Sequence, residues 1–194
     1  LQHFPEIAEA MLARAWTFVN HGFYNPRYIT SFSEEQEREF FARCRETFRR
    51  LTGRELRGQS GPAGSNTERT PDILAEVGFT YQTDWKIDDQ PVPIKVRSGR
   101  LVCIPYTSEL NDAPLMRHHY EGDYYAKVCK AQFDQLYREG AENGRLMCIA
   151  FHPYVMGRPH RVEYLAEVLD YIMGHDGVWQ ATTDEIAEYY LANY

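Results

Sequence analysis

Two histidines directly follow apolar segments of this 194-residue chain. His21 comes after residues 16–20, and His152 comes after residues 146–151, a nearly continuous apolar run. Both segments are typical of buried strands. In parallel α/β folds the residues that do chemistry gather at the carboxyl ends of strands, so the two imidazoles are candidate catalytic groups. Because histidine titrates near neutral pH, such a group can donate or accept a proton.

The same rule selects Asp84 and Trp85, which follow a strand predicted at residues 79–83. A further strand is predicted at residues 55–59, and Gly61 and Pro62 lie in the segment after it. A tryptophan beside a polar strand end offers a platform for a sugar or another planar ring. These residues, together with Asn25, are therefore candidates for binding a substrate.

Each of these side chains also has a purely structural interpretation. His21 could bond a backbone carbonyl at a strand end, and His152 could be a buried histidine held by its neighbours. Asn25 precedes a proline and could simply start a turn. Asp84 could cap a turn, and Trp85 could belong to the core. For His152 in particular, the position at the end of an apolar strand favours a functional role.

Helical patterns alternate with the predicted strands. Apolar residues recur at helical spacing near residues 5–15, 34–52, 70–77, 123–139, 162–172 and 183–194. Ser33 with Gln36, and Thr182 with Glu185, have the spacing of capping boxes. Residues 93–105 alternate around Ser98-Gly99 and predict a β-hairpin, and residues 178–181 predict a last strand. The strand–helix alternation predicts an α/β fold with a parallel sheet of about five strands.

Composition limits the partners. The net charge of −7 argues against nucleic acid or an anionic membrane surface, and favours a neutral or cationic small molecule. The four cysteines form no CxxC pair, so they indicate neither a zinc knuckle nor a disulfide framework. No apolar run reaches the roughly 20 residues that span a bilayer. We therefore expect a cytoplasmic protein without a membrane segment.

Taken in order, the polar segments resemble the motifs of the polysaccharide deacetylases with NodB homology. His21 matches the first histidine of the second motif, and Asn25 stands where a second histidine is expected. Residues 58–64 and 66–72 are similar to the third motif, Asp84-Trp85 to the fourth and residues 151–153 to the fifth. Residues 88–91 and 109–112, with Glu109 and Asn111, look like the allantoinase-like, cofactor-independent branch.

This resemblance implies a fold and a reaction. The fold would be an incomplete (β/α) barrel, TIM-like and of the NodB type, that lacks its first strands. Residues 1–194 would then form a single domain equivalent to the C-terminal two-thirds of the barrel. In the family, the histidine that matches His152 protonates the leaving nitrogen. Asn25 replaces a metal ligand, so we expect no cofactor, with zinc or another divalent metal as the alternative.

The implied function is a hydrolase acting on non-peptide carbon–nitrogen bonds. His152 and His21 would be catalytic, and the substrate would be an N-acetylated sugar or a cyclic amide, bound by Asn25, Asp84, Trp85, Gly61, Pro62, Glu109 and Asn111. The alternative is a catalytically silent module that binds a carbohydrate or another ligand. An exposed sheet edge would favour a homo-oligomer, or folding only with a partner or with further parts of the same protein.

Overall fold

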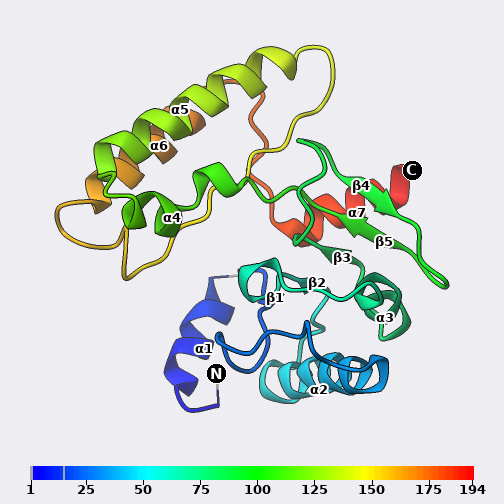
Figure 1. The fold of residues 1–194 in the computed structure, drawn as a ribbon. Helices are drawn as coiled ribbons and strands as arrows, with labels where there is room; N and C mark the ends of the chain where they lie inside the picture. Colours follow the sequence, from blue (N-terminus) through cyan, green and yellow to red (C-terminus); the bar gives the residue numbers. More distant parts are fainter. Residues whose placement is uncertain (1, 15) are drawn as a thin grey trace. The chain divides into compact units, whose positions relative to one another are not determined.

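The computed structural model describes residues 2–14 and 16–194, which divide into two compact units (Figure 1). The first unit comprises residues 1–85, 91–104 and 181–194, and the second comprises residues 86–90 and 105–180. The first unit contains α1 (Pro5–Ala13), α2 (Glu34–Thr52), α3 (Thr70–Glu76), α7 (Thr183–Asn193) and all five strands. The second contains α4 (Asp112–Arg117), α5 (Gly122–Glu139) and α6 (Val162–Met173). Among the described residues, no helix is long and apolar enough to cross a membrane.

The first unit is built on one sheet with the strand order β1-β2-β3-β5-β4. The strands are β1 (Val19–Asn20), β2 (Gly58–Gln59), β3 (Tyr81–Gln82), β4 (Val92–Ile94) and β5 (Leu101–Cys103). Strands β1, β2, β3 and β5 are parallel, and only β4 pairs antiparallel, with β5. The parallel pairing places the carboxyl ends of β1, β2 and β3 at the same edge of the sheet.

Helices α2 and α3 pack on one side of this sheet. A capping box starts α2, since the Ser33 side chain accepts from Gln36 N and the Gln36 side chain accepts from Ser33 N. The helix ends at Gly53, whose φ of 70° suits a residue without a side chain. Its apolar stripe joins residues of α3 and β5 in one core cluster, made of Ile29, Phe41, Cys44, Phe48, Leu56, Ile73, Leu74, Phe79 and Leu101.

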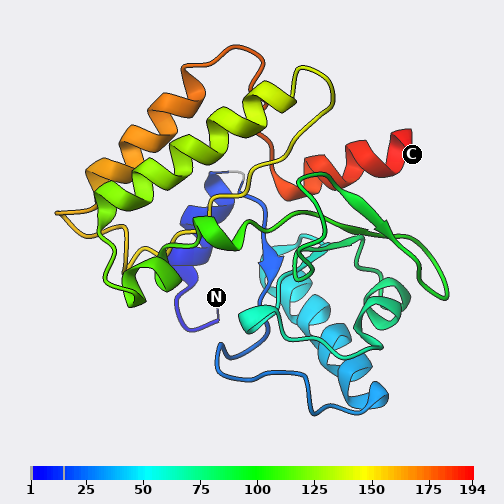
Figure 2. The ribbon, with the colours of Figure 1, turned by 45° about the horizontal axis from the view of Figure 1, so that its top comes forward.

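Helix α7 lies on the other side of the sheet (Figures 1 and 2). The fully buried Tyr81 of β3 links it to the strands, because its hydroxyl lies 2.7 Å from Thr183 Oγ1 and donates to Asp184 Oδ1 at 2.8 Å. Gly58 pairs with Tyr81 in the neighbouring strand, and a Cβ atom at position 58 would lie 2.1 Å from the Tyr81 ring. Glycine is therefore required at position 58 for the ring to reach α7.

The second unit is mainly a pair of neighbouring helices, α5 and α6. Their facing residues form a separate core cluster with Leu110 and Met156, which also contains Tyr125, Ala126, Cys129, Leu165 and Val168. Asn111 and Ala150 form an isolated parallel β-bridge, so the segments that contain them run side by side. The Tyr125 hydroxyl donates to the carbonyl oxygens of Leu110 at 3.2 Å and Ala150 at 3.3 Å. This tyrosine thus fixes both segments to α5.

The structure confirms much of the predicted element order and corrects two strands. The parallel sheet, the predicted helices, both capping boxes and the hairpin of residues 93–105 are present. Residues 146–151 form only the bridge at Ala150, and residues 178–181 form no strand. Strand composition alone is insufficient there, because a strand also needs a hydrogen-bonded neighbour. That the two units form a single domain stays a prediction.

Removing the Tyr81 hydroxyl tests the attachment of α7. We expect Tyr81→Phe to lower the free energy of unfolding by about 1–2 kcal/mol, because partly buried Asp184 loses its hydrogen-bond donor. Urea unfolding measures this loss, and hydrogen exchange should show it mainly in residues 183–193. Tyr24→Phe, at an exposed position, is the matched control. Equal stabilities for the two variants would contradict this role of the Tyr81 hydroxyl.

Candidate active site

In the first unit, His21 directly follows β1 and is held through both ring nitrogens. Nδ1 lies 2.5 Å from the carbonyl oxygen of Ser60, and Nε2 lies 3.0 Å from Asn25 Oδ1. The Nδ1–H group donates to the Ser60 carbonyl, and the Asn25 side-chain amide, which can present either its oxygen or its NH2 group, bonds Nε2. Asn25 therefore fixes the orientation of the imidazole.

Asp84 follows β3 at the same edge of the sheet. Its Oδ1 accepts a hydrogen bond of 2.6 Å from the backbone N–H of Gly61, which lies just beyond β2. Burial raises the pKa of Asp84 to about 6, although the Gly61 bond, the Asn66 side chain and the charge of His21 act in the opposite direction. The first unit therefore gathers His21, Asn25, Gly61 and Asp84 at the ends of three adjacent strands, as their positions in the sequence predict.

Open space adjoins this cluster. His21 lines a cavity of about 610 Å³ together with residues of β1 and α2 that include Asn20, Arg43 and Phe48. A second hollow, of about 440 Å³, is lined by Tyr28, Trp85 and residues 63–66. Cavities of this size are within the usual range for small-molecule sites. Trp85 is half-exposed at the wall of the second hollow, which fits a surface for ring stacking better than a core position.

The first-unit cluster does not form a metal site by itself. Across residues 2–14 and 16–194, no group of three or more His, Cys, Asp or Glu side chains is arranged to hold a metal ion. Both ring nitrogens of His21 are occupied by hydrogen bonds, so neither presents a free lone pair. Asn25, where the family pattern has a histidine, is the partner of one of them. The described residues therefore do not fit a metal.

In the second unit, His152 is paired with a buried carboxylate. Its Nδ1 lies 2.6 Å from Asp112 Oδ1, and its backbone N–H donates to Asp112 Oδ2 at 2.8 Å. The Asp112 side chain is fully buried, whereas 36% of the His152 side chain is exposed. A carboxylate that accepts from Nδ1 leaves Nε2 as the atom that can exchange a proton with a substrate. This geometry is that of an oriented general acid or base.

The backbone around the pair fixes its geometry. Asp112 N donates to Ala150 O at 3.1 Å, and Ala150 N donates to Leu110 O at 3.1 Å. The segments that contain Asp112 and His152 are therefore hydrogen-bonded neighbours, and the two residues lie just beyond the paired positions. The ring of Tyr154 lies 5.3 Å from that of His152 and is largely exposed. An exposed aromatic ring next to the imidazole gives a bound substrate an apolar surface.

The remaining predicted residues have varied environments. The Asn111 side chain is used at both ends, since Oδ1 accepts from Ala113 N at 2.9 Å and Nδ2 donates to the Tyr106 hydroxyl at 2.7 Å. It caps α4 and fixes Tyr106. Glu109 is exposed in a short 3-10 turn, and Pro62 is buried in another. Binding of a substrate by these three residues stays a prediction.

Asp112 was not singled out from the sequence, although it carries the clearest functional contact. It is separated from His152 by 40 residues, and it does not follow an apolar strand. The available signal was its place in the segment 109–112, which has the pattern of the allantoinase-like branch. The structure brings Asp112 to His152, and it brings His21 to Asn25. The assignment of His21 and His152 to one shared site stays a prediction.

Comparisons with known proteins concern the family and the fold. The family model described as polysaccharide deacetylase matches residues 1–82. A Schizosaccharomyces pombe protein assigned to the polysaccharide deacetylases is 29% identical over 150 residues, which are 70% of this chain and 47% of that protein. A solved structure from Pseudomonas aeruginosa PAO1 with the same assignment is 29% identical, with a TM-score of 0.91 over 100% of this chain and 65% of that one. The structure of Puue allantoinase is 28% identical, with a TM-score of 0.89 and the same coverage.

The family model, the fission yeast relative and the solved structures support an assignment of the chain to the polysaccharide deacetylase family. Its α/β fold with a parallel sheet matches barrels of the NodB type, and the barrel is incomplete in this chain. An allantoinase is among its structural neighbours. The chain spans less than two-thirds of the length of these relatives, namely 47% of the fission yeast protein and 65% of each of the two structures.

The buried carboxyl group of Asp84 predicts a pH-dependent stability. The folded state raises its pKa from 3.8 to about 6, so the folded protein retains the proton at a pH where the unfolded chain has lost it. Ionisation therefore destabilises the fold as the pH rises between these values, by up to about 3 kcal/mol. We expect Asp84→Asn to remove this loss, which urea unfolding from pH 4 to pH 7 measures.

Asp170→Asn is the control for this titration, because Asp170 is an exposed aspartate. It should follow the wild-type pH dependence. A constant difference in stability between wild type and Asp84→Asn over the whole range would show that Asp84 does not titrate with a raised pKa.

Proposed function

We propose that this protein is a hydrolase of non-peptide carbon–nitrogen bonds, in which His152 acts as the general acid. The Asp112–His152 pair carries the proposal, because a fully buried carboxylate holds the Nδ1 side of a half-exposed imidazole. Assignment to the polysaccharide deacetylase family and likeness to an allantoinase structure support the reaction class. Both names describe the cleavage of an amide bond. An N-acetylated sugar and a cyclic amide are the two candidate substrates.

The proposed step transfers one proton to nitrogen. Water adds to the carbonyl carbon of the amide, and the carbon–nitrogen bond then breaks. The departing nitrogen takes a proton from Nε2 of His152, which prevents the formation of an unstable amide anion. Asp112 keeps the other ring proton on Nδ1 and stabilises the imidazolium before the transfer. The attacking water releases one proton to solvent, and the neutral imidazole then takes up one proton from solvent, so the acid is regenerated and one water is consumed for each amide bond.

The first-unit cluster has a separate proposed role. His21, held by Ser60 and Asn25, would orient the substrate or the attacking water by hydrogen bonding. Asp84 and Trp85 would contact the substrate from the edge of the sheet and the wall of the adjacent hollow. Because the residues of this cluster do not fit a metal, no proposed step passes through one. Activity that survives a chelator would support this role, and activity that requires an added divalent metal would contradict it.

The acid role predicts the kinetics of two variants of the full-length protein. We expect His152→Ala to lower kcat by about 100-fold to 10,000-fold, because the leaving nitrogen loses its proton donor. Asp112→Asn should lower kcat at least about tenfold with a smaller change in KM, because the imidazole loses its orientation and its preferred tautomer. Turnover of allantoin and of an N-acetylglucosamine oligomer measures both effects.

His160→Ala, at an exposed histidine eight residues further on, is the control and should retain wild-type turnover. Wild-type turnover by His152→Ala would overturn the assignment of the acid. If the folded wild-type protein binds an N-acetylglucosamine oligomer but does not hydrolyse either substrate, the silent binding module becomes the better interpretation.

A further inference from the structure

Glu37 of α2 is a fully buried glutamate whose partners are hydroxyl groups. The Thr67 hydroxyl donates to Oε2 at 2.7 Å, and the Thr70 hydroxyl donates to Oε1. Among the described residues, no lysine or arginine forms an ion pair with Glu37. Burial raises the pKa of Glu37, while the two hydroxyl groups act in the opposite direction. An apolar residue would fill this position without that cost, so the carboxyl group requires an explanation beyond packing.

The two hydroxyl groups belong to the segment 61–70, which consists of the loop after β2 and Thr70, the first residue of α3; this segment is called the loop of residues 61–70. Thr70 Oγ1 accepts from Thr67 N at 2.8 Å, and Thr67 Oγ1 accepts from Arg69 N at 3.1 Å. Earlier in this loop, Ala63 has a φ of 53°, in the left-handed region that costs a non-glycine residue free energy. Contacts with the rest of the protein must therefore hold the loop in its conformation. Glu37 supplies two of these contacts, to the hydroxyl groups of Thr67 and Thr70.

The other side of the same loop forms the surroundings of Asp84. Gly61, at the start of the loop, donates its N–H to Asp84 Oδ1, and the Asn66 side chain also interacts with Asp84. Asn66 is adjacent to Thr67, and its Nδ2 donates to Gly64 O at 2.9 Å. Residues 63–66 line the hollow that Trp85 also lines. A shift of Thr67 would thus displace Asn66 and the wall of this hollow.

We propose that Glu37 is a positioning residue, which fixes the loop of residues 61–70 through Thr67 and Thr70 and thereby places Gly61 and Asn66 against Asp84. Glu37 does not contact the hollow, so its effect on the substrate passes through the loop. Its significance for catalysis rests on the proposed function, in which Asp84 and Trp85 bind the substrate. The positioning itself is a property of the fold and can be measured separately.

Hydrogen exchange of the full-length protein, followed by mass spectrometry, tests the positioning. We expect Glu37→Gln to accelerate exchange in residues 61–70 about tenfold, because the loss of one hydroxyl contact weakens the loop by about 1.4 kcal/mol. Peptides from the core of α2, residues 40–48, should change less than about twofold. Thr67→Val leaves α2 unchanged but removes both the hydroxyl donor to Glu37 and the acceptor for Arg69 N, so it should accelerate exchange at least as much. Thr67→Ser keeps the hydroxyl and should restore wild-type exchange.

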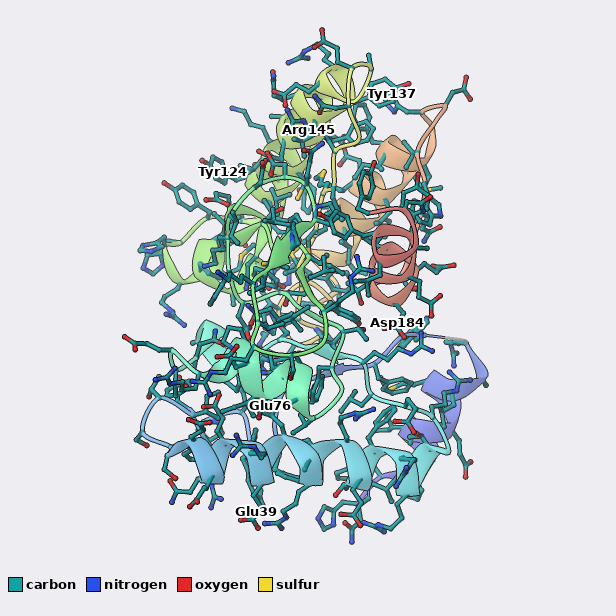
Figure 3. The ribbon with its side chains drawn as sticks, turned by 90° about the vertical axis from the view of Figure 1, so that its right-hand side faces the viewer. Glu39, Glu76, Tyr124, Tyr137, Arg145 and Asp184 are labelled. Atoms are coloured by element: carbon teal, nitrogen blue, oxygen red, sulfur yellow. The ribbon has the colours of Figure 1, made fainter. Side chains whose placement is uncertain are left out.

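Glu39→Gln is the matched control on the same helix. Figure 3 shows the Glu39 side chain on the outer side of α2, and its side chain is 73% exposed. It should leave exchange unchanged in both segments. Unchanged exchange of residues 61–70 in Glu37→Gln and Thr67→Val would overturn the proposal. Equal acceleration of the loop and of residues 40–48 would also overturn it, since Glu37 would then stabilise the whole unit.

Kinetics connect the positioning to the substrate. If the wild-type protein hydrolyses either substrate, Glu37→Gln should raise KM severalfold with kcat within about twofold, as expected when binding contacts are lost uniformly. A selective loss of kcat would contradict a role through the loop. If the wild type has no turnover, the proposed function fails, and the exchange experiment still decides whether Glu37 positions the loop.

Discussion

A carboxyl group removed from water must be hydrogen-bonded, and the bond between Asp112 and His152 meets this requirement at the candidate site of the second unit. Asp112 accepts from both the ring and the backbone of His152, so the carboxylate keeps two strong partners in a fully buried position. The same contacts fix the imidazole. The same hydrogen bonds therefore stabilise the buried carboxylate and orient the candidate acid.

The first unit meets this requirement fully for Glu37, which accepts two threonine hydroxyls, and only in part for Asp84. Asp84 Oδ1 accepts the backbone N–H of Gly61, whereas Oδ2 is buried without a hydrogen-bond partner among the described residues. Neutral donors compensate burial less completely than a cation would, and the pKa of each carboxyl group is raised. Such groups depend on the exact placement of the loops that supply their donors. The loop of residues 61–70 supplies hydrogen-bond donors to both carboxyl groups. It therefore connects helix α2, which carries Glu37, to the edge of the sheet at Asp84.

The strand ends explain why side chains far apart in the sequence can meet. In-register parallel pairing of β1 with β2, and of β2 with β3, brings the residues that follow each strand to one edge. The strands have only two residues each, yet hydrogen bonds beyond them continue the pattern, as from Ser60 N to Asn20 O. The cluster around His21 and Asp84 is a direct result of this register. In this cluster Asn25, which stands where the family motif has a histidine, bonds Nε2 of His21.

The sequence by itself determined the helices with their caps, the parallel sheet and the resemblance to the polysaccharide deacetylase family. These features depend on local periodicity, on capping residues such as Ser33 and Thr182, and on motifs that stay in chain order. It also predicted His21 and Asp84 as strand-end residues, and it selected His152, which follows a single β-bridge residue, Ala150, and not a strand. The strands expected at 146–151 and 178–181 were wrong, because composition does not specify a hydrogen-bonded neighbour.

Only the tertiary structure decided that Asp112 is the partner of His152 and that Glu37 bonds the loop next to Asp84. Both contacts join residues at least 30 positions apart, and their burial depends on how whole segments pack, which no local pattern encodes.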